Sequence, residues 1–560
     1  MNSPQPAHPV TTFSLRATAL AAAALAAGML GLFAACSESR IGTAPPPVLT
    51  PPAAPVADAL SCGGALGGIN LQTATVVELQ AALKAGTISS ERLVQQSLAR
   101  IAAFDLRGNA AAPQLNSIRV LAPTALEQAR AADARRARGE SLGPLDGLPI
   151  LLKDNVGTRD MPTTAGSITL ALNIPKVEAT LTQKLRAGGA IVLGKTNLSE
   201  FANWVSLNMP NGYSSLGGQV IAAYDYAADP LGSSTGSGVA STMAFATAAI
   251  GSETSGSIIS PAIVHSLVGV KPTIGLVSRA GVIPLAHVFD TAGPMARTVT
   301  DAAALLGVVA GVDPLDDASP GFTAALGGVV PDYLAALKPD ALQGVRLGVR
   351  DFDLTTEGLF GAALDVLRAQ GAEIVEYTEG DTANLSLLSI AVITNEFKWY
   401  LNKYLAEEAG PGLPVATLND IILLNAQNMD TVQYGQDLLI ASNAMSGLAL
   451  DPVYLASRTA AVTGSQRALD AAINDNQLDA IVAPGSGNIT ATASAGYPNV
   501  TVPMGYEGQV PQGLSFAGAP FTEDKLLAYA YAYEQATRKR IPPTTLNPAL
   551  AAYCQSIGAL

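Results

Sequence analysis

The chain has 560 residues, of which 49% are hydrophobic and 14% charged. Disorder needs low hydrophobicity and high charge, so a wholly disordered chain is excluded and a large core is expected. Lysine and arginine number 32 against 45 acidic residues, a formal net charge of −13, which argues against a nucleic-acid partner. With only three histidines, His8, His265 and His287, a mechanism that depends on imidazole has few candidates.

Residues 1–35 have the pattern of an export signal. Arg16 precedes a run from Ala17 to Ala35 that contains no charged residue and ends in small residues before Cys36. A positive charge, an apolar run and small residues before a break are typical of a secretory signal peptide. An uncleaved membrane anchor is the alternative, because about 20 apolar residues can span a bilayer. The segment from Leu32 to Cys36 resembles a bacterial lipobox, which predicts an exported protein that is periplasmic or held at the membrane by a lipid on Cys36.

Residues 36–68 are predicted to form a tether rich in proline and alanine. The composition between Ser37 and Ala59 favours an extended, polyproline-like spacer that buries little surface. Cys62 follows this spacer, and Cys554 lies near the other end of the chain. In an oxidising compartment these two cysteines could pair and tie the first folded segment to the last; two unrelated thiols are the alternative.

From residue 69 onward, helix and strand signals alternate. Thr75 to Glu78 is a capping box that opens a helix, and Ser90 can cap the next one. Leu148 to Leu152 is a short apolar run after proline and glycine, which predicts a buried strand with Lys153 at its end. A helix over Leu181–Arg186 and a strand over Ala190–Leu193 follow.

The second half continues the same alternation. Small and apolar residues from Gly238 to Ala249 predict a helix buried against a sheet. The later predicted elements are strands at Leu267–Val270, Ala480–Ala483 and Val500–Val502 and a long helix from Glu523 to about Arg538. Because no linker interrupts the alternation, we expect one α/β domain with a large sheet over residues 69–545, followed by a C-terminal tail over 546–560.

The segment from Gly232 to Gly238 matches the Gly-x-Ser-x-Gly elbow of serine hydrolases, with Ser234 in the nucleophile's place. That interpretation lacks a histidine, since none follows His287 and the only one upstream is His8, inside the signal. The residues before Gly232 are loop-like, whereas the elbow needs a strand there. A flexible linker is an equally poor interpretation, because the segment leads directly into a predicted buried helix.

A serine nucleophile without histidine needs another base. A lysine can serve if burial or neighbouring charge moves its pKa from about 10.4 toward 7. Lys153 ends an apolar strand and is therefore a candidate, although most lysines are solvated surface charges. A second small-residue segment, Gly251 to Ile258, can point several backbone N–H groups at one spot, as an oxyanion requires.

Three segments together resemble the amidase signature family. They are Pro149–Asn155 around Lys153, the Gly-Ser-Ser-Thr-Gly-Ser-Gly run from Gly232, and Thr254–Ala262. Lys153 to Ser233 spans 80 residues and Ser233 to Ser257 spans 24, spacings that agree with the family. The resemblance extends from about Ile69 to Pro543 and is weakest between Leu315 and Asn476. It implies a single large α/β domain in which a mostly mixed central sheet is covered by helices on both faces.

The resemblance also implies the roles of the site residues. Ser257 would be the nucleophile, Ser233, in a cis peptide after Gly232, would relay the proton, and Lys153 would be the neutral base. The backbone N–H groups of Thr254, Ser255, Gly256 and Ser257 would form the oxyanion hole. Ser234 would support the triad by hydrogen bonding.

The expected function is hydrolysis of a linear carboxamide, with peptide C-terminal amides as one substrate class. Ile259 stands where many family members carry arginine, which argues against an acidic acyl group. An aryl or fatty acyl amidase with the same triad is one alternative, and an amidotransferase A-type subunit, less favoured, is the other. The partner is a small amide or peptide amide. No metal cluster or nucleotide fingerprint is present in the sequence, so no metal and no cofactor are expected.

Overall fold

The computed structural model describes residue 62 and residues 64–557, apart from 107–111, 356, 381–383, 428–431 and 448–449. The predicted signal over 1–35, Cys36 and most of the tether lie outside the described residues. All described residues belong to one compact unit. In this part of the chain, the helices fall short of the length and apolarity that a membrane span requires.

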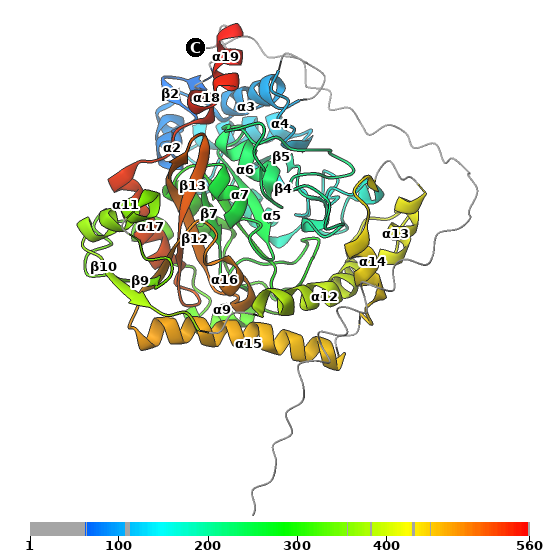
Figure 1. The fold of residues 1–560 in the computed structure, drawn as a ribbon. Coiled ribbons are helices and arrows are strands. Elements are labelled where there is room, and N and C mark those ends of the chain that lie inside the picture. Colours follow the sequence, from blue (N-terminus) through cyan, green and yellow to red (C-terminus); the bar gives the residue numbers. More distant parts are fainter. Residues whose placement is uncertain are drawn as a thin grey trace, which may run out of the picture. The chain divides into compact units, whose positions relative to one another are not determined.

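A mixed sheet of eleven strands runs through the described part of the chain, as the sequence predicted (Figure 1). In spatial order its strands are β10 (Glu373–Tyr377), β9 (Arg346–Arg350), β11 (Ala480–Pro484), β13 (Val510–Ala517), β12 (Asn499–Glu507), β7 (Val268–Lys271), β8 (Thr291–Ala296), β6 (Ala248–Glu253), β4 (Pro149–Lys153), β5 (Ile191–Thr196) and β3 (Ile118–Leu121). Strand β4 is parallel to both of its neighbours, β5 and β6, whereas β6 and β7 are both antiparallel to β8. Every residue of β4, β5 and β6 is buried, as expected for strands covered on both faces.

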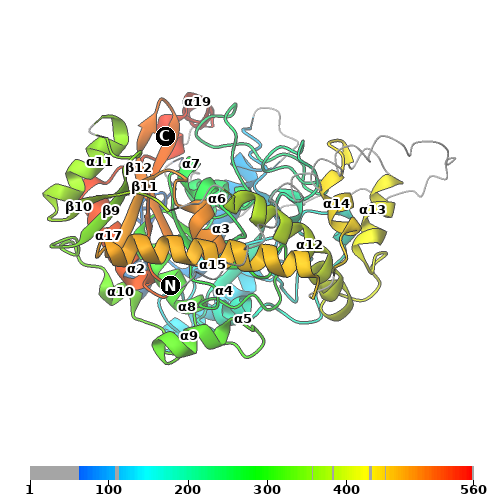
Figure 2. The ribbon, with the colours of Figure 1, turned by 60° about the horizontal axis from the view of Figure 1, so that its bottom comes forward.

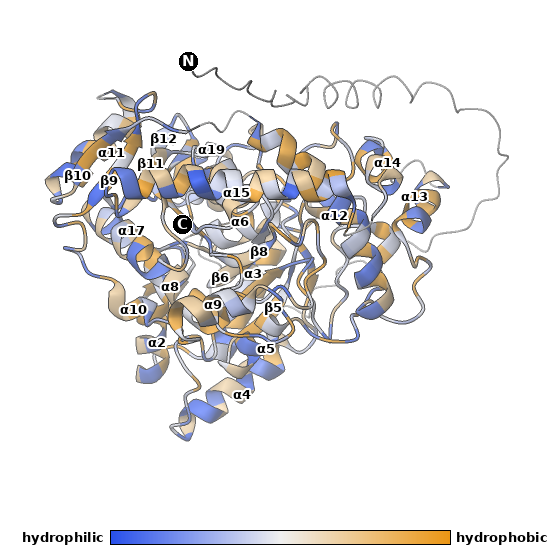
Figure 3. Cartoon of the chain, turned by 90° about the horizontal axis from the view of Figure 1, so that it is seen from below, coloured by the Kyte–Doolittle hydropathy of each residue, from blue (hydrophilic) through white to orange (hydrophobic). Residues whose placement is uncertain are grey.

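Helices cover both faces of this sheet (Figure 2). On one face lie α6 (Thr235–Thr242) and α7 (Ile259–Val264), and on the other α5 (Thr180–Ala187), α8 (Val299–Val309) and α17 (Glu523–Thr537). The outer helix α4 (Ala125–Ala137) carries many hydrophilic residues, in keeping with its place on the surface (Figure 3). Further helices of this unit are α2 (Val76–Ala85), α3 (Ser90–Phe104), α9 (Ser319–Leu326), α10 (Tyr333–Ala336), α11 (Gly358–Ala369) and α16 (Ile489–Ala495).

The later part of the weakly matched region, residues 385–475, forms a group of helices (Figure 2). It consists of α12 (Leu385–Glu407), α13 (Leu418–Ala426), α14 (Asp437–Ala444) and α15 (Pro452–Asp475). These helices share a hydrophobic cluster with residues from earlier in the chain, among them Phe201 and Phe289. The rings of Phe201 and Phe397 of α12 meet edge to face with centroids 5.6 Å apart. The group is thereby packed against the loops that surround the candidate site.

Several predicted elements are confirmed, with small shifts at their ends. Thr75 caps α2 through the predicted capping box, and the cap of α3 is Ser89, one residue before the expected Ser90. The long helix near the C-terminus, α17, spans Glu523–Thr537. The predicted strand ending at Lys153 is β4.

The prediction of one helix from Gly238 to Ala249 is wrong. Helix α6 ends at Thr242, and β6 begins at Ala248 and pairs with β4 and β8. Small apolar residues fit a buried strand as well as a buried helix, and periodicity cannot separate the two in a continuous apolar run.

The two ends of the folded unit meet at a disulfide between Cys62 and Cys554, whose Cα atoms lie 5.7 Å apart. Near it, β1 (Ala65–Leu66) pairs with β2 (Ile69–Asn70), and the chain ends in α18 (Pro543–Leu546) and α19 (Pro548–Ser556) (Figure 1). Leu66 and Leu550 are part of the main hydrophobic cluster. Residues from the predicted tether and from the predicted tail therefore pack in the same core as the domain.

Candidate active site

Lys153 is held inside the sheet at the end of β4. Its side chain is fully buried, and its Nζ donates hydrogen bonds to Ser233 Oγ at 2.8 Å and to the Ser252 carbonyl oxygen at 3.0 Å. Burial lowers the pKa of Lys153 to about 7, and the negative charges of Asp290 and Glu253 oppose that shift. At neutral pH a substantial fraction of the amine is therefore uncharged and able to accept a proton.

Ser233 follows a cis peptide bond with Gly232 and is fully buried. A Cβ at position 232 would lie 2.4 Å from Ser199 Oγ, so a residue without a side chain is required there. The Ser233 carbonyl accepts a hydrogen bond from the Ser199 N–H at 3.1 Å, and α6 begins two residues later at Thr235. These contacts fix the Ser233 hydroxyl against the lysine amine.

Ser257 lies in the loop between β6 and α7. The N–H of Ser234 donates to the Ser257 carbonyl at 3.1 Å, which brings the backbone of Ser257 next to the Gly232–Ser234 turn. Ser234 also links the two segments through its side chain: its Oγ donates to the Ser252 carbonyl at 3.0 Å and accepts from the Ser252 N–H at 3.2 Å. The Ser257 hydroxyl makes no hydrogen bond to any described residue, and 6% of the residue remains exposed.

The turn that carries Ser257 presents free backbone N–H groups. In the described structure, the N–H groups of Thr254, Ser255, Gly256 and Ser257 donate to no protein acceptor. Those of Ile258 and Ile259, the next two residues, bind Glu253 Oε2 at 2.8 and 3.0 Å. The turn therefore has unused donors beside the nucleophile candidate, and the Glu253 carboxylate holds its far side in place.

Gly256 is required for the shape of this turn. Its φ is +80°, a conformation that residues with a Cβ rarely adopt. A Cβ there would also lie 3.1 Å from Ser260 Oγ and 3.3 Å from Ile489 Cγ2 of α16.

Four residues at the site had no predicted role. The Ser252 carbonyl accepts from Lys153, and its Oγ accepts from Asn155 Nδ2 at 2.8 Å. Asp290 accepts from Thr254 Oγ1 and from the N–H groups of Leu285 and Ala286. Glu253 is the fourth. Asn155, Ser252 and Glu253 lie within the motif segments, but residue type alone does not predict which atoms each of them contacts.

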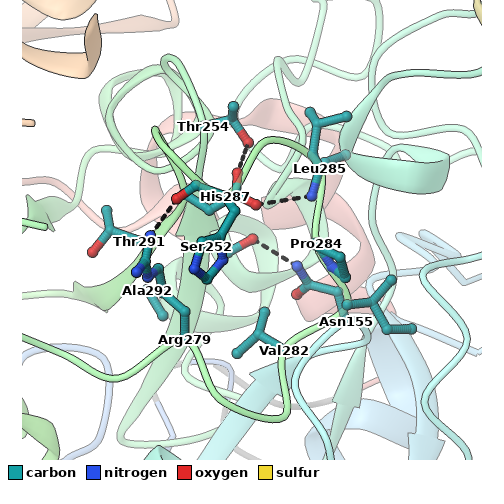
Figure 4. Close-up of a pocket in the computed structure, with 13 residues that line it drawn as sticks. Asn155, Ser252, Thr254, Arg279, Val282, Pro284, Leu285, His287, Thr291 and Ala292 are labelled. Carbon is teal, nitrogen blue, oxygen red and sulfur yellow. Dashed lines mark hydrogen bonds between the residues drawn. The ribbon is translucent and has the colours of Figure 1, made fainter. Parts of the chain in front are cut away.

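A cavity of about 30 Å³ adjoins these residues (Figure 4). Figure 4 shows Ser252 and Asn155 facing each other at its wall, with Thr254 beside the loop that carries Leu285. The apolar part of its lining includes Val282, Ile283, Pro284 and Leu285.

Neither described histidine can replace the lysine. His265 is buried, its Nδ1 lies 2.7 Å from the Pro261 carbonyl, and burial lowers its pKa to about 4. His287 bonds Asp317 through Nε2 at 2.9 Å and stacks on Tyr400. The side chains of His287, Asp316 and Asp317 lie close enough together to share a cation. The Arg279 guanidinium, however, already pairs with the carboxylates of Asp316 and Asp317. Because these carboxylates already bind the arginine, a metal ion is disfavoured there.

The structure thus brings Lys153, Ser233, Ser234 and the turn of Ser257 together. The roles of these residues in catalysis stay predictions.

Comparison with known proteins gives consistent matches. A family model described as "Amidase" matches residues 93–494. A probable amidase of Arabidopsis thaliana is 36% identical over 495 residues, which cover 85% of this chain and 92% of that protein. The A-type subunit of glutamyl-tRNA(Gln) amidotransferase from a Synechococcus strain is 34% identical over 81% of this chain and 91% of its own.

Solved structures agree. The native peptide amidase of Stenotrophomonas maltophilia is 40% identical and superposes with a TM-score of 0.78, covering 84% of this chain and 98% of its own. A peptide amidase in complex with the competitive inhibitor chymostatin gives the same identity and TM-score and covers 84% of this chain and 99% of its own.

Proposed function

The chain belongs to the amidase family, is an amidase and resembles the peptide amidases; from that premise we propose that it hydrolyses linear carboxamides, peptide C-terminal amides among them, through a Ser257–cis-Ser233–Lys153 triad and an acyl-enzyme. The observation that carries this proposal is the hydrogen bond from a fully buried lysine amine to the Ser233 hydroxyl.

In the proposed mechanism, neutral Lys153 accepts the proton of Ser233 while Ser233 accepts the proton of Ser257. The Ser257 oxygen attacks the amide carbonyl and forms a tetrahedral intermediate. Its negative oxygen is stabilised by the N–H groups of residues 254–257, which donate to no acceptor in the described structure.

Collapse of this intermediate breaks the C–N bond. The leaving nitrogen takes a proton back from the Lys153 ammonium through Ser233, so ammonia or an amine departs neutral. Water then attacks the acyl-enzyme by the same proton route and releases the carboxylic acid.

The class of substrate is supported by the peptide amidase neighbours, one of which binds the inhibitor chymostatin. It is also supported by Ile259, which is fully buried in an apolar cluster with Ile263 and Ile489. No cation stands at this position to bind an acidic acyl group, which favours neutral peptide amides over glutamine.

A panel of amides tests the proposal. Purified protein is incubated with N-acylated dipeptide amides, long-chain fatty acid amides, anilides and free glutamine, and release of ammonia or aniline is measured. We expect the highest kcat/KM on the peptide amides. Preference for anilides or fatty amides would assign the aryl or fatty acyl amidase alternative.

The amidotransferase relatives justify the glutamine arm of that panel, because the A-type subunit of that enzyme is 34% identical to this chain. Glutamine hydrolysis that exceeded hydrolysis of the peptide amides would replace the proposal with that function.

We further propose that the enzyme is exported and anchored by a lipid on Cys36. The proposal is supported by the charge-free run before Cys36 and by the Cys62–Cys554 disulfide, which an oxidising compartment favours. Metabolic labelling with palmitate should mark the wild-type protein at the membrane. A Cys36→Ser variant that is labelled equally would contradict the lipid anchor.

A further inference from the structure

A second cavity, of about 470 Å³, carries a concentration of positive charge. Four cationic side chains line it: Arg297, Arg538, Lys539 and Arg540. Only two carboxyl groups, those of Glu78 and Glu534, share the lining. This balance is the reverse of that in the whole chain, where acidic residues outnumber lysine and arginine by 45 to 32.

The cations come from separate parts of the fold. Arg297 follows β8, whereas residues 538–540 follow α17; the rim is completed by Gln72, Thr73, Thr75 and Glu78 from the N-terminal segment and by Val502 and Pro503 of β12. The negative end of the α17 dipole stabilises cations just after that helix. It does not explain Arg297, which a different element brings to the same cavity.

Neither carboxyl group neutralises these cations. No described carboxylate lies within 4.0 Å of the four cationic groups as an ion-pair partner. Glu78 is engaged by the capping box of α2. Glu534 accepts from the Val299 N–H at 2.9 Å, and burial raises its pKa to about 8, so its carboxyl is largely uncharged at neutral pH.

Two of the guanidinium groups are fixed in place by backbone carbonyls. Arg297 Nη1 donates to the carbonyls of Ser241 and Ala246, both at 2.9 Å. Arg540 donates to the carbonyls of Gln72 at 2.8 Å and Thr242 at 3.0 Å. Carbonyl oxygens orient these groups without cancelling their charge.

Both of these arginines keep a buried donor without a partner. Arg297 is only 2% exposed, and its Nε, like that of Arg540, bonds no described residue. Burial lowers the pKa of Arg297 to about 10; the negative charge of Asp301 opposes that shift, and repulsion by the charge of Arg540 adds to it. An unpaired buried donor and a buried pair of like charges are both costly, and one anion between them would relieve both costs.

We propose that this cavity is a binding site for an oxyanion group, phosphate or carboxylate, of a small molecule, in which Arg297 and Arg540 are the fixed donors and Arg538 and Lys539 the outer ones. The site is separate from the amidase chemistry, since none of the triad residues lines it. The same oxyanion chemistry occurs in a free metabolite and in the phosphate of a lipid headgroup.

Calorimetric titration of the Cys36→Ser chain with inorganic phosphate and with citrate tests the site. We expect saturable binding that weakens as ionic strength rises. The double variant Arg538→Gln/Lys539→Gln removes two exposed charges and should weaken binding about tenfold or more, because charge-assisted hydrogen bonds are the strong ones. Its amide hydrolysis should be unchanged.

The matched control is Arg130→Gln/Arg138→Gln, which removes two exposed arginines of the α4 region that form surface ion pairs. It should bind both anions as the wild type does. Phosphate should also raise the thermal midpoint of the wild type and of this control but not that of the 538/539 variant.

Flotation with phosphatidylglycerol vesicles, against phosphatidylcholine vesicles, identifies the source of the oxyanion. Binding to the anionic vesicles that depends on residues 538 and 539, with no binding of free anions, assigns a headgroup. If phosphate, citrate and anionic vesicles all fail to bind, or if the double variant binds them as tightly as the wild type, the proposal is wrong.

Discussion

The amine of Lys153 donates to the Ser233 hydroxyl at 2.8 Å across 80 residues of sequence. The lysine reaches this place because β4 is buried from Pro149 to Lys153, and the backbone of the serine is held there by the hydrogen bond from the Ser199 N–H to its carbonyl. Proton transfer to the lysine needs an uncharged amine, and burial favours the uncharged amine because it lowers the pKa of Lys153.

Replacement of Lys153 should abolish the base without unfolding the protein. Lys153→Ala is expected to lower kcat about 10²- to 10⁴-fold, the usual contribution of general acid–base catalysis. Lys153→Arg should be equally inactive, because arginine keeps its proton at all working pH values. The measurement is steady-state hydrolysis of a peptide amide, with the exposed Lys176→Arg as the control. A Lys153→Arg enzyme with wild-type kcat would exclude lysine as the base.

The pH dependence of kcat/KM should show a single ionisation near pH 7, that of the Lys153 amine, which must be deprotonated for activity. Below this pH the amine is ammonium and cannot accept a proton, so activity falls by about tenfold per pH unit. The variant His287→Gln should leave the profile in place, since His287 bonds Asp317 and stacks on Tyr400. A profile that moved or flattened in His287→Gln would point to imidazole.

The same lysine links stability to pH. Its pKa is 10.5 when exposed and about 7 in the folded protein, so between these values the unfolded chain binds more protons than the folded one. The free energy of unfolding should therefore gain a favourable contribution as pH rises from 7 to 10.5, and this slope should be smaller in Lys153→Met. Chemical denaturation at a series of pH values measures it.

Ser257 is expected to carry the acyl group. In the wild type, added hydroxylamine should divert the acyl-enzyme to a hydroxamate, whereas Ser257→Ala should form neither acid nor hydroxamate. Ser233→Ala should lower kcat by a factor similar to that of Ser257→Ala, because residues that act as a unit have non-additive effects. Ser260→Ala, three residues along in α7, is the matched control. Hydroxamate formation by Ser257→Ala would show that another nucleophile acts.

Gly256→Ala should impair the oxyanion turn. The positive φ and the contacts at 3.1 and 3.3 Å oppose a Cβ there, and a displaced N–H donor costs about 10²- to 10³-fold in kcat. Ser255→Ala is the control: its side chain is exposed, and its backbone N–H remains. We expect Gly256→Ala to reduce kcat far more than KM. Equal activity of the two variants would remove the turn from the mechanism.

The disulfide should contribute to stability and not to catalysis. Cys62→Ser/Cys554→Ser is expected to lower the free energy of unfolding by about 2–4 kcal/mol, the usual effect of losing a bridge. Thermal denaturation measures the loss of stability, and mass spectrometry of a non-reduced digest detects the bridge itself. Two free thiols in the mature wild-type protein would contradict the bridge.

Much of the candidate site could be predicted from the sequence because its parts are short and continuous. A buried strand that ends in lysine points to Lys153, whereas Ser233 and Ser257 follow from the resemblance to the amidase signature family. The contacts made by backbone atoms could not be predicted, since any residue type offers a carbonyl. Ser252, whose carbonyl accepts from Lys153, is one such case.

The fold was predictable where periodicity or capping was distinctive, as in α2 and β4. It was not predictable between Gly238 and Ala249, where uniformly small residues hide the change from α6 to β6. Nor did the sequence indicate that Arg297 and Arg540 line the same cavity, because they lie far apart in the chain and come together only where α17 packs against α8 and β12.

The bridge between Cys62 and Cys554 makes the folded body a covalently closed loop of chain. A single proteolytic cut in a surface loop between these two residues would therefore leave both fragments joined, and a molecule nicked outside the cell would keep its parts together. Because the disulfide brings the two ends of this loop together, a cargo fused behind α19 would begin close to Cys62.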